Sequence, residues 1–166
     1  MCTEAGFVFD DGVVARLTDD TFLCHTTSGG SDRVYAWFEE WLQTEWFDFQ
    51  VYVSNLTEQY SQIGISGPAS KPLLEKVLDK EGSLNELSFM GCMTEKYKNV
   101  ELNIFRISFS GELSYEVAVP TKHALKFWLD CVELGKKFGI QPYGTEALHV
   151  MRAEKGFIIV GQETDG

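Results

Sequence analysis

The sequence has little positive charge and no long apolar run, and these two absences exclude several classes of protein. Its 166 residues include 14 Lys and Arg against 25 Asp and Glu, which gives a formal net charge of −11. No Lys/Arg cluster appears, so nucleic acid and anionic membrane surfaces are poor partners. No apolar stretch approaches the ~18 residues of a membrane span, and no charged-then-apolar start resembles a signal peptide. We therefore expect a cytoplasmic protein that binds neither nucleic acid nor membrane.

Metal-ligand and nucleotide-binding motifs are also missing. The chain lacks GxGxxG, GxxxxGK[ST], GxSxG and HExxH, so it carries no nucleotide fingerprint of its own. Its cysteines have no CxxC spacing and its few histidines are scattered, at Cys2, Cys24, Cys92, Cys131, His25, His123 and His149. We expect no metal site and reduced, mostly structural thiols.

The content of 44% hydrophobic and 13% aromatic residues is enough to bury a core. Hydrophobic alternation predicts strands over 7–17, 21–27, 51–56 and 60–65, with two more within 100–120. Helical spacing predicts helices at about 32–46, 68–80, 121–137 and 144–155. The mixed, polar stretch 84–98 is a candidate junction between two lobes, 1–83 and 84–166. This order predicts an α+β fold with ferredoxin-like layers, in which helices pack on antiparallel sheets.

The most informative segment is the predicted hairpin over 106–116, which carries Glu116 inside an otherwise apolar strand. Successive strand residues face opposite sides. Ser114, Glu116 and Ala118 therefore share one side of the strand, away from Tyr115. A carboxylate in that position lines either solvent or a polar pocket, because burial without a partner costs several kcal/mol. Solvent is the commoner case for a Glu considered alone, and the accompanying motifs favour the pocket.

Two other segments could carry chemistry. Asp10-Asp11-Gly12 places neighbouring carboxylates in an otherwise apolar strand, which suits proton transfer to and from an amine nitrogen. The alternative is a β-bulge or turn with solvated acids. His25-Thr26-Thr27 ends the next predicted strand, where an imidazole and hydroxyls either line a pocket or simply form a turn.

These segments together resemble a known family. The run 106–116 is similar to the signature of the aminomethyltransferases (glycine-cleavage T-proteins), in which Gly-Glu is followed by a small residue, an aromatic and Glu. The segment 9–13 resembles the early strand of that superfamily, which bears a functional Asp. Segments 40–46, 142–146 and 152–166 resemble, more specifically, the folate-binding part of the C-terminal half of heterotetrameric sarcosine oxidase alpha subunits.

The resemblance implies a tetrahydrofolate site. Glu116 would hydrogen-bond the pterin, whose NH2 and adjacent ring NH suit a bidentate, charge-assisted pair with a carboxylate. Asp11 would be the catalytic residue that positions the folate amine and manages its proton while a one-carbon unit is captured. Asp10 remains an alternative for this role, because either of the two neighbouring Asp residues can be aligned with the functional Asp of the family. Three further folate-binding residues are implied by the same comparison: Val13, Thr26 and Phe109.

At two positions this chain differs from residues that other branches of the superfamily carry. T-proteins that act on lipoyl-bound aminomethyl groups carry an Arg where this chain has Leu148. The related iron–sulfur-assembly folate proteins carry a Cys where this chain has Phe157. The resemblance thus favours the sarcosine oxidase branch, in which the one-carbon unit from oxidative demethylation of sarcosine becomes 5,10-methylenetetrahydrofolate. A non-catalytic folate-binding or assembly domain and a glycine-cleavage aminomethyltransferase remain as alternatives.

The resemblance also implies that the chain is a fragment of a larger subunit. FAD, FMN and NAD would be bound elsewhere in the parent enzyme, and the isolated fragment would be inactive on sarcosine. Its partners would be the remaining alpha-subunit domains and the other sarcosine oxidase subunits. We also expect that apolar surface left uncovered could make the fragment a homo-oligomer.

Overall fold

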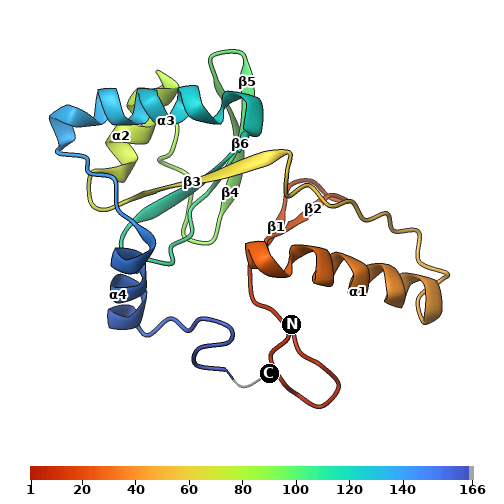
Figure 1. The fold of residues 1–166 in the computed structure, drawn as a ribbon. Coiled ribbons are helices and arrows are strands. Elements are labelled where there is room, and N and C mark those ends of the chain that lie inside the picture. Colours follow the sequence, from red (N-terminus) through yellow and green to blue (C-terminus); the bar gives the residue numbers. More distant parts are fainter. Residues whose placement is uncertain (165–166) are drawn as a thin grey trace.

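A computed structural model describes residues 1–164 and shows four α-helices and two antiparallel sheets, which confirms the predicted α+β class (Figure 1). Asp165 and Gly166, which end the last family-like segment, lie outside the described residues. No helix among the described residues is long and apolar enough to cross a membrane. The elements are β1 Val14–Arg16, β2 Phe22–Cys24, η1 Ser28–Gly30, α1 Ser31–Thr44, β3 Tyr60–Ser66, α2 Ser70–Leu78, β4 Cys92–Tyr97, β5 Val100–Phe105, β6 Ser114–Pro120, α3 Thr121–Gly135, η2 Lys136–Phe138 and α4 Thr145–Lys155.

A four-stranded antiparallel sheet with the order β3-β6-β5-β4 forms the centre of the fold. Strands β4, β5 and β6 follow one another as a meander, whereas α2 connects β3 at one edge of the sheet to β4 at the other edge. β3 pairs with β6 along its whole length, from Tyr60 opposite Pro120 to Ser66 opposite Ser114. Because β3 and β4 lie in the same sheet, the two predicted lobes on either side of residue 83 share one sheet and one core.

The main core lies between this sheet and helices α2 and α3, which cover one of its faces (Figure 1). Tyr115, Val117 and Val119 of β6 are at most 1% exposed and pack there with Ile63 and Ile65 of β3. Burying each such apolar side chain contributes roughly 1.5–3 kcal/mol. The alternate residues of β6 must therefore face the other side of the sheet.

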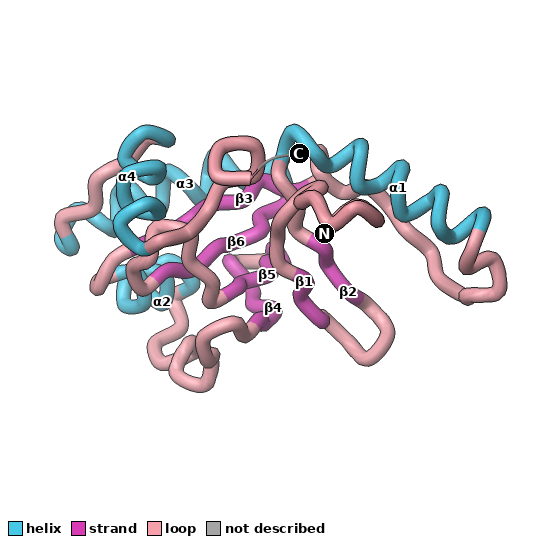
Figure 2. The backbone as a smooth tube through the Cα atoms, turned by 90° about the horizontal axis from the view of Figure 1, so that it is seen from below, coloured by secondary structure: helices cyan, strands magenta, loops and turns pink. Residues whose placement is uncertain are grey.

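The β1-β2 hairpin lies beside that other side of the sheet, as the view in Figure 2 shows. The hairpin was predicted, and the structure has it with shorter strands and Ala15 opposite Leu23. A second, smaller cluster joins Ala15 to Phe105, Ile107 and Ala118. This packing holds the end of β2 near β6.

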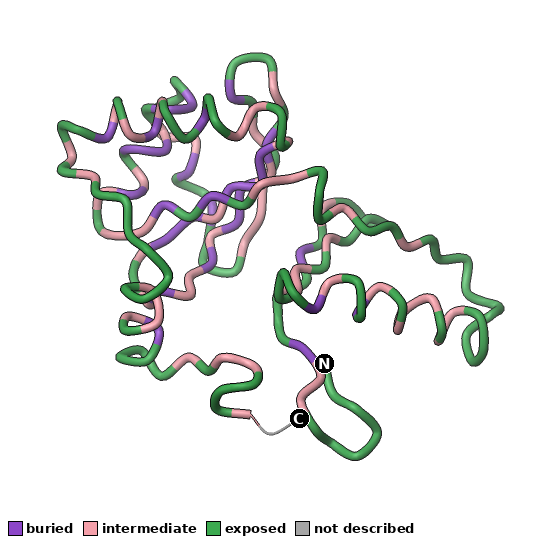
Figure 3. Tube along the Cα trace, viewed as in Figure 1, coloured by how far each residue is buried: buried purple, intermediate pink, exposed green. Residues whose placement is uncertain are grey.

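Helix α1 is poorly covered, with Val34 as its one buried residue among the described side chains (Figure 3). Its Trp37 ring lies 5.0 Å from Phe9, and Trp41 stacks on Trp46 at 5.3 Å. The strand predicted over 51–56 is wrong, because this segment runs back from α1 to β3 without pairing to another strand (Figure 1).

The predicted junction over 84–98 contains β4, which the polar sequence did not indicate as a strand. β4 is an edge strand that pairs only with β5, so most of its side chains need no apolar character. Leu84 and Leu87, just before it, are buried in the main core. This stretch therefore belongs to the sheet domain.

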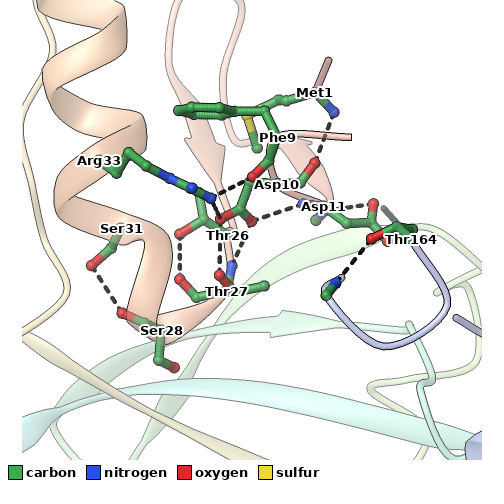
Figure 4. Close-up of polar contacts among 12 residues, drawn as sticks. Met1, Phe9, Asp10, Asp11, Thr26, Thr27, Ser28, Ser31, Arg33 and Thr164 are labelled. Atoms are coloured by element: carbon green, nitrogen blue, oxygen red, sulfur yellow. Dashed lines mark hydrogen bonds and ion pairs between the residues drawn. The ribbon is translucent and has the colours of Figure 1, made fainter. Parts of the chain in front are cut away.

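The Asp10 carboxylate ties the N-terminal segment to the turn before α1 (Figure 4). Asp10 is 1% exposed, and its Oδ1 accepts the backbone N–H of Asp11 at 2.8 Å and of Thr27 at 2.9 Å. Its Oδ2 accepts the Thr27 hydroxyl at 2.8 Å, and the Arg33 guanidinium lies 4.0 Å away. Only glycine fits at Gly30, because a Cβ there would lie 1.9 Å from Oδ2. Asp10 therefore positions the corner that follows β2.

We expect Asp10→Asn to lower the free energy of unfolding by about 1–3 kcal/mol, because an amide NH2 cannot accept and would leave a buried donor without its acceptor. Urea denaturation monitored by tryptophan fluorescence measures this change. The matched control is Asp11→Asn, since Asp11 is exposed and a side-chain carbonyl can still accept its contact from the Gly12 N–H. Equal losses in the two variants would contradict a structural role specific to Asp10.

Candidate functional site

A cavity of about 440 Å³ opens between the β1-β2 hairpin, α1 and the uncovered face of the main sheet. That volume is within the usual range for small-molecule sites. The sheet supplies Gln62, Glu116 and Ala118, and the residues after β2 supply His25 and Thr26. The walls formed by β2 and α1 are largely apolar or aromatic, and the segment 52–57 is mixed. The remaining lining residues are Phe22, Leu23 and Cys24 of β2, Ser28 of η1, Ser31, Val34, Tyr35 and Phe38 of α1, Tyr52, Val53, Ser54, Asn55, Leu56 and Thr57 of the following segment, and Tyr60 of β3.

Glu116 is the carboxylate of this cavity. It lies in β6 between the core residues Tyr115 and Val117, and its side chain is on the opposite face. Gln62 of β3 donates a hydrogen bond from Nε2 to Oε2 of Glu116 at 3.0 Å. A carboxylate has about four acceptor positions, and Gln62 occupies one of them. Glu116 therefore keeps acceptor capacity at a cavity large enough for a ligand.

His25 lies beside this carboxylate. Its ring meets Phe105 edge to face, with centroids 4.6 Å apart and an interplanar angle of 85°. Burial lowers the pKa of the His25 imidazole, and the negative charge of Glu116 opposes that shift. Since burial is the larger cause, the net shift favours the neutral form of the imidazole. The polar end of the cavity thus combines one carboxylate, one amide and one imidazole.

The backbone next to Asp11 lies close to the cavity wall. Gly12 packs so closely against the residue that follows β2 that a Cβ at Gly12 would lie 1.8 Å from the His25 carbonyl oxygen. The His25 N–H in turn donates to the Val13 carbonyl at 2.8 Å. The Asp11 side chain is exposed and accepts from the Gly12 N–H at 2.8 Å, but it is not among the cavity-lining residues. Asp11 is therefore close in the chain to the cavity wall without forming part of it.

The three other folate-binding residues implied by the resemblance, Thr26, Val13 and Phe109, do not all lie at the cavity. Thr26 lines the cavity together with Glu116. Val13 packs against the smaller core cluster, and Phe109 stacks on Phe157 with centroids 6.3 Å apart and an interplanar angle of 10°. Neither of these two lines the cavity. The structure thus brings together Thr26 and Glu116, and it leaves the predicted stacking ring Phe109 elsewhere.

Sequence reasoning missed Gln62, although a signal for it exists. Within β3, Gln62, Gly64 and Ser66 alternate with buried Ile63 and Ile65, which indicates a polar face. What the alternation does not reveal is the register, in which Gly64 lies opposite Glu116. The aromatic residues Tyr35 and Phe38 were missed because their helical spacing is equally typical of a core helix.

Comparisons with known proteins agree with the resemblance in the sequence. Sarcosine oxidase subunit alpha of Corynebacterium sp. (strain P-1) is 48% identical over 100% of the chain and 17% of that protein. The corresponding subunit of Rhizobium meliloti (strain 1021) is 36% identical over 95% of the chain and 16% of that protein. The aminomethyltransferase of Thermoanaerobacter sp. (strain X514) is 28% identical over 98% of the chain and 43% of that protein.

The chain therefore spans less than a fifth of the length of these sarcosine oxidase subunits and less than half of the aminomethyltransferase. Residues 1–166 match the family described as the GCVT N-terminal domain. With a match over its whole length, an α+β fold and relatives of both kinds, this chain belongs to the GCVT N-terminal domain family.

Proposed function

We propose that this chain is a tetrahydrofolate-binding segment of a sarcosine oxidase alpha-like subunit, where a one-carbon unit is captured as 5,10-methylenetetrahydrofolate. The observation that carries the proposal is the position of Glu116, which lies on the polar face of β6 at a cavity of about 440 Å³. The identity of 48% over the whole chain to a protein named sarcosine oxidase subunit alpha supports the choice of branch.

The donor and acceptor groups of the cavity fit a pterin. A pterin presents an NH2 and an adjacent ring N–H on one edge, and the Glu116 carboxylate can accept both in a charge-assisted pair. Tyr35, Phe38 and Tyr60 supply aromatic surface on the cavity wall, which suits a flat ring system. Tetrahydrofolate, when bound, supplies the amine nitrogens that take up the one-carbon unit.

Asp11 is proposed to manage the proton of the folate amine. Its exposed carboxylate is engaged only by the adjacent Gly12 N–H among its described contacts, so it is available for proton transfer. The Asp10 carboxylate instead accepts three hydrogen bonds in a buried position, which supports a structural role for it. This difference favours Asp11 over Asp10 for the catalytic role.

The activity of the whole protein belongs to a larger assembly in this proposal. FAD, FMN and NAD would serve sarcosine oxidation in other parts of the alpha subunit and in the other subunits. The exposed side chains that follow α1, including Trp46, Phe47 and Phe49, would be covered by those partners. In the isolated chain the same apolar surface would favour self-association.

A second candidate is a non-catalytic folate-binding or assembly domain. The observation that favours it is that the Asp11 side chain does not line the cavity that Glu116 and Thr26 share. Binding of tetrahydrofolate without any effect of Asp11 on one-carbon capture would support this candidate. The glycine-cleavage alternative is less favoured, because Leu148 stands where that branch carries an Arg.

We expect Glu116→Gln to weaken tetrahydrofolate binding by about 1.5–3 kcal/mol, because an amide replaces the charged acceptor of the pterin edge. Isothermal titration calorimetry under anaerobic conditions measures the change. Glu112→Gln, on the exposed turn before β6, is the matched control and should leave affinity unchanged. Undiminished binding by Glu116→Gln would contradict the proposed function.

We expect Asp11→Asn to retain tetrahydrofolate affinity while slowing formation of 5,10-methylenetetrahydrofolate by roughly 10²–10⁴-fold, the usual contribution of a positioned acid or base. The assay uses the complete sarcosine-oxidising assembly, with sarcosine oxidation followed separately as the control. An unchanged rate of methylene capture would assign the proton to another group and favour the second candidate.

The negative charge beside His25 can be tested without folate. Since Glu116 opposes the lowering of the His25 pKa, removing that charge in Glu116→Gln should lower this pKa further. NMR titration of the imidazole resonances measures the shift, and His123 on α3 serves as an internal control. A higher His25 pKa in the variant would show that the two side chains are not arranged as described.

A further inference from the structure

We propose that Gln62 is a second pterin-recognition residue: one N–H of its amide holds the Glu116 carboxylate, and the other donates to the 4-oxo oxygen of a pterin bound there. This inference rests on the proposed function and extends it to a choice among pteridines. It assigns to one side chain both the positioning of Glu116 and direct recognition of the ligand.

The first step is the orientation of the amide. A carboxylate of Glu accepts hydrogen bonds and cannot donate, so the Gln62 group that faces Glu116 at 3.0 Å must be the NH2. The amide nitrogen carries two N–H groups, and only one of them points to Oε2. No other described residue accepts from Nε2. One donor therefore remains at the cavity, next to the carboxylate.

The second step is the match to the ligand. Along its recognition edge a pterin presents the 2-amino donor, the N3–H donor and the O4 acceptor in that order. The carboxylate of Glu116 matches the two donors, and the remaining N–H of Gln62 matches the acceptor. Gln62 and Glu116 both line the cavity, and Gln62 is exposed to it, so a ligand can reach both groups.

The third step is the rigidity of the pair. β3 and β6 are hydrogen-bonded along their full length, with Gln62 opposite Ala118 and Gly64 opposite Glu116. Gln62 and Glu116 are thus diagonal neighbours on one face, a separation that long side chains span. Gly64 has no side chain to compete for the Glu116 carboxylate. The sheet therefore sets the pair in place before any ligand arrives.

The chemistry predicts a specific preference. In a 4-amino pteridine the group at position 4 is a donor and N3 is an acceptor. An N–H of Gln62 would then face another N–H, so 4-amino analogues should gain nothing from Gln62. Leaving out one such hydrogen bond changes affinity by up to about tenfold.

The test measures the binding of tetrahydrofolate and of a 4-amino analogue, aminopterin, to the chain and to Gln62→Met, which keeps the length of the side chain without its donors. We expect Gln62→Met to weaken tetrahydrofolate binding by about 3–10-fold and aminopterin binding by less than about twofold. Ser61→Ala is the matched control, since Ser61 precedes Gln62 in β3 and does not line the cavity. It should change neither affinity.

A double-mutant cycle separates the two roles of Gln62. Because Gln62 also positions Glu116, the effect of Gln62→Met should shrink in the Glu116→Gln background, and an undiminished effect would overturn the positioning role. Equal losses for both ligands, or no loss in Gln62→Met, would overturn the inference while leaving the proposed function intact. Failure of the unmodified chain to bind tetrahydrofolate, or full affinity in Glu116→Gln, would instead overturn the proposed function.

Discussion

The alternation of side chains along β6 is the constraint on which the fold and the candidate site both depend. Tyr115, Val117 and Val119 are buried against α2 and α3, so the backbone of β6 cannot rotate or slip by one residue without exposing the core. The same constraint directs Glu116 to the opposite face, where the cavity lies. The apolar core thus holds a polar group in a defined position.

Pairing of β6 with β3 gives the Glu116 side chain its hydrogen-bond partner. A strand that formed only a hairpin with β5 would leave Glu116 without a neighbour on its open side. β3 pairs with β6 on the side opposite β5 and brings the Gln62 amide nitrogen to 3.0 Å from the Glu116 carboxylate. The β1-β2 hairpin forms another wall of the cavity through β2, and Ala15 of β1 packs in one cluster with Phe105 and Ala118. Three segments that are far apart in sequence therefore form the polar end of one cavity.

The two neighbouring acids show how burial separates similar residues. Asp10 is enclosed by Thr27, Gly30 and Arg33, and its oxygens hold the chain where the hairpin meets α1. Asp11 faces outward from the same turn. The side chain of Asp10 stabilises the turn that places Thr26 and His25 in the cavity wall, while the exposed Asp11 carboxylate accepts a hydrogen bond from the adjacent Gly12 N–H. A doublet in the sequence thus becomes one structural and one accessible carboxylate.

The sequence by itself determined the α+β class, the four helices, the N-terminal hairpin and the polar face that carries Glu116. These follow from local periodicity, because a period near 3.6 or 2 is a property of neighbouring residues. It also determined the family, through several short segments in a fixed order. Only the tertiary structure decided which acid of the doublet is buried, that 51–56 pairs with no strand, and that Gln62 meets Glu116 while Phe109 lies against Phe157. Those outcomes depend on strand register and on contacts between distant segments, which the packing of the whole chain sets and no local pattern encodes.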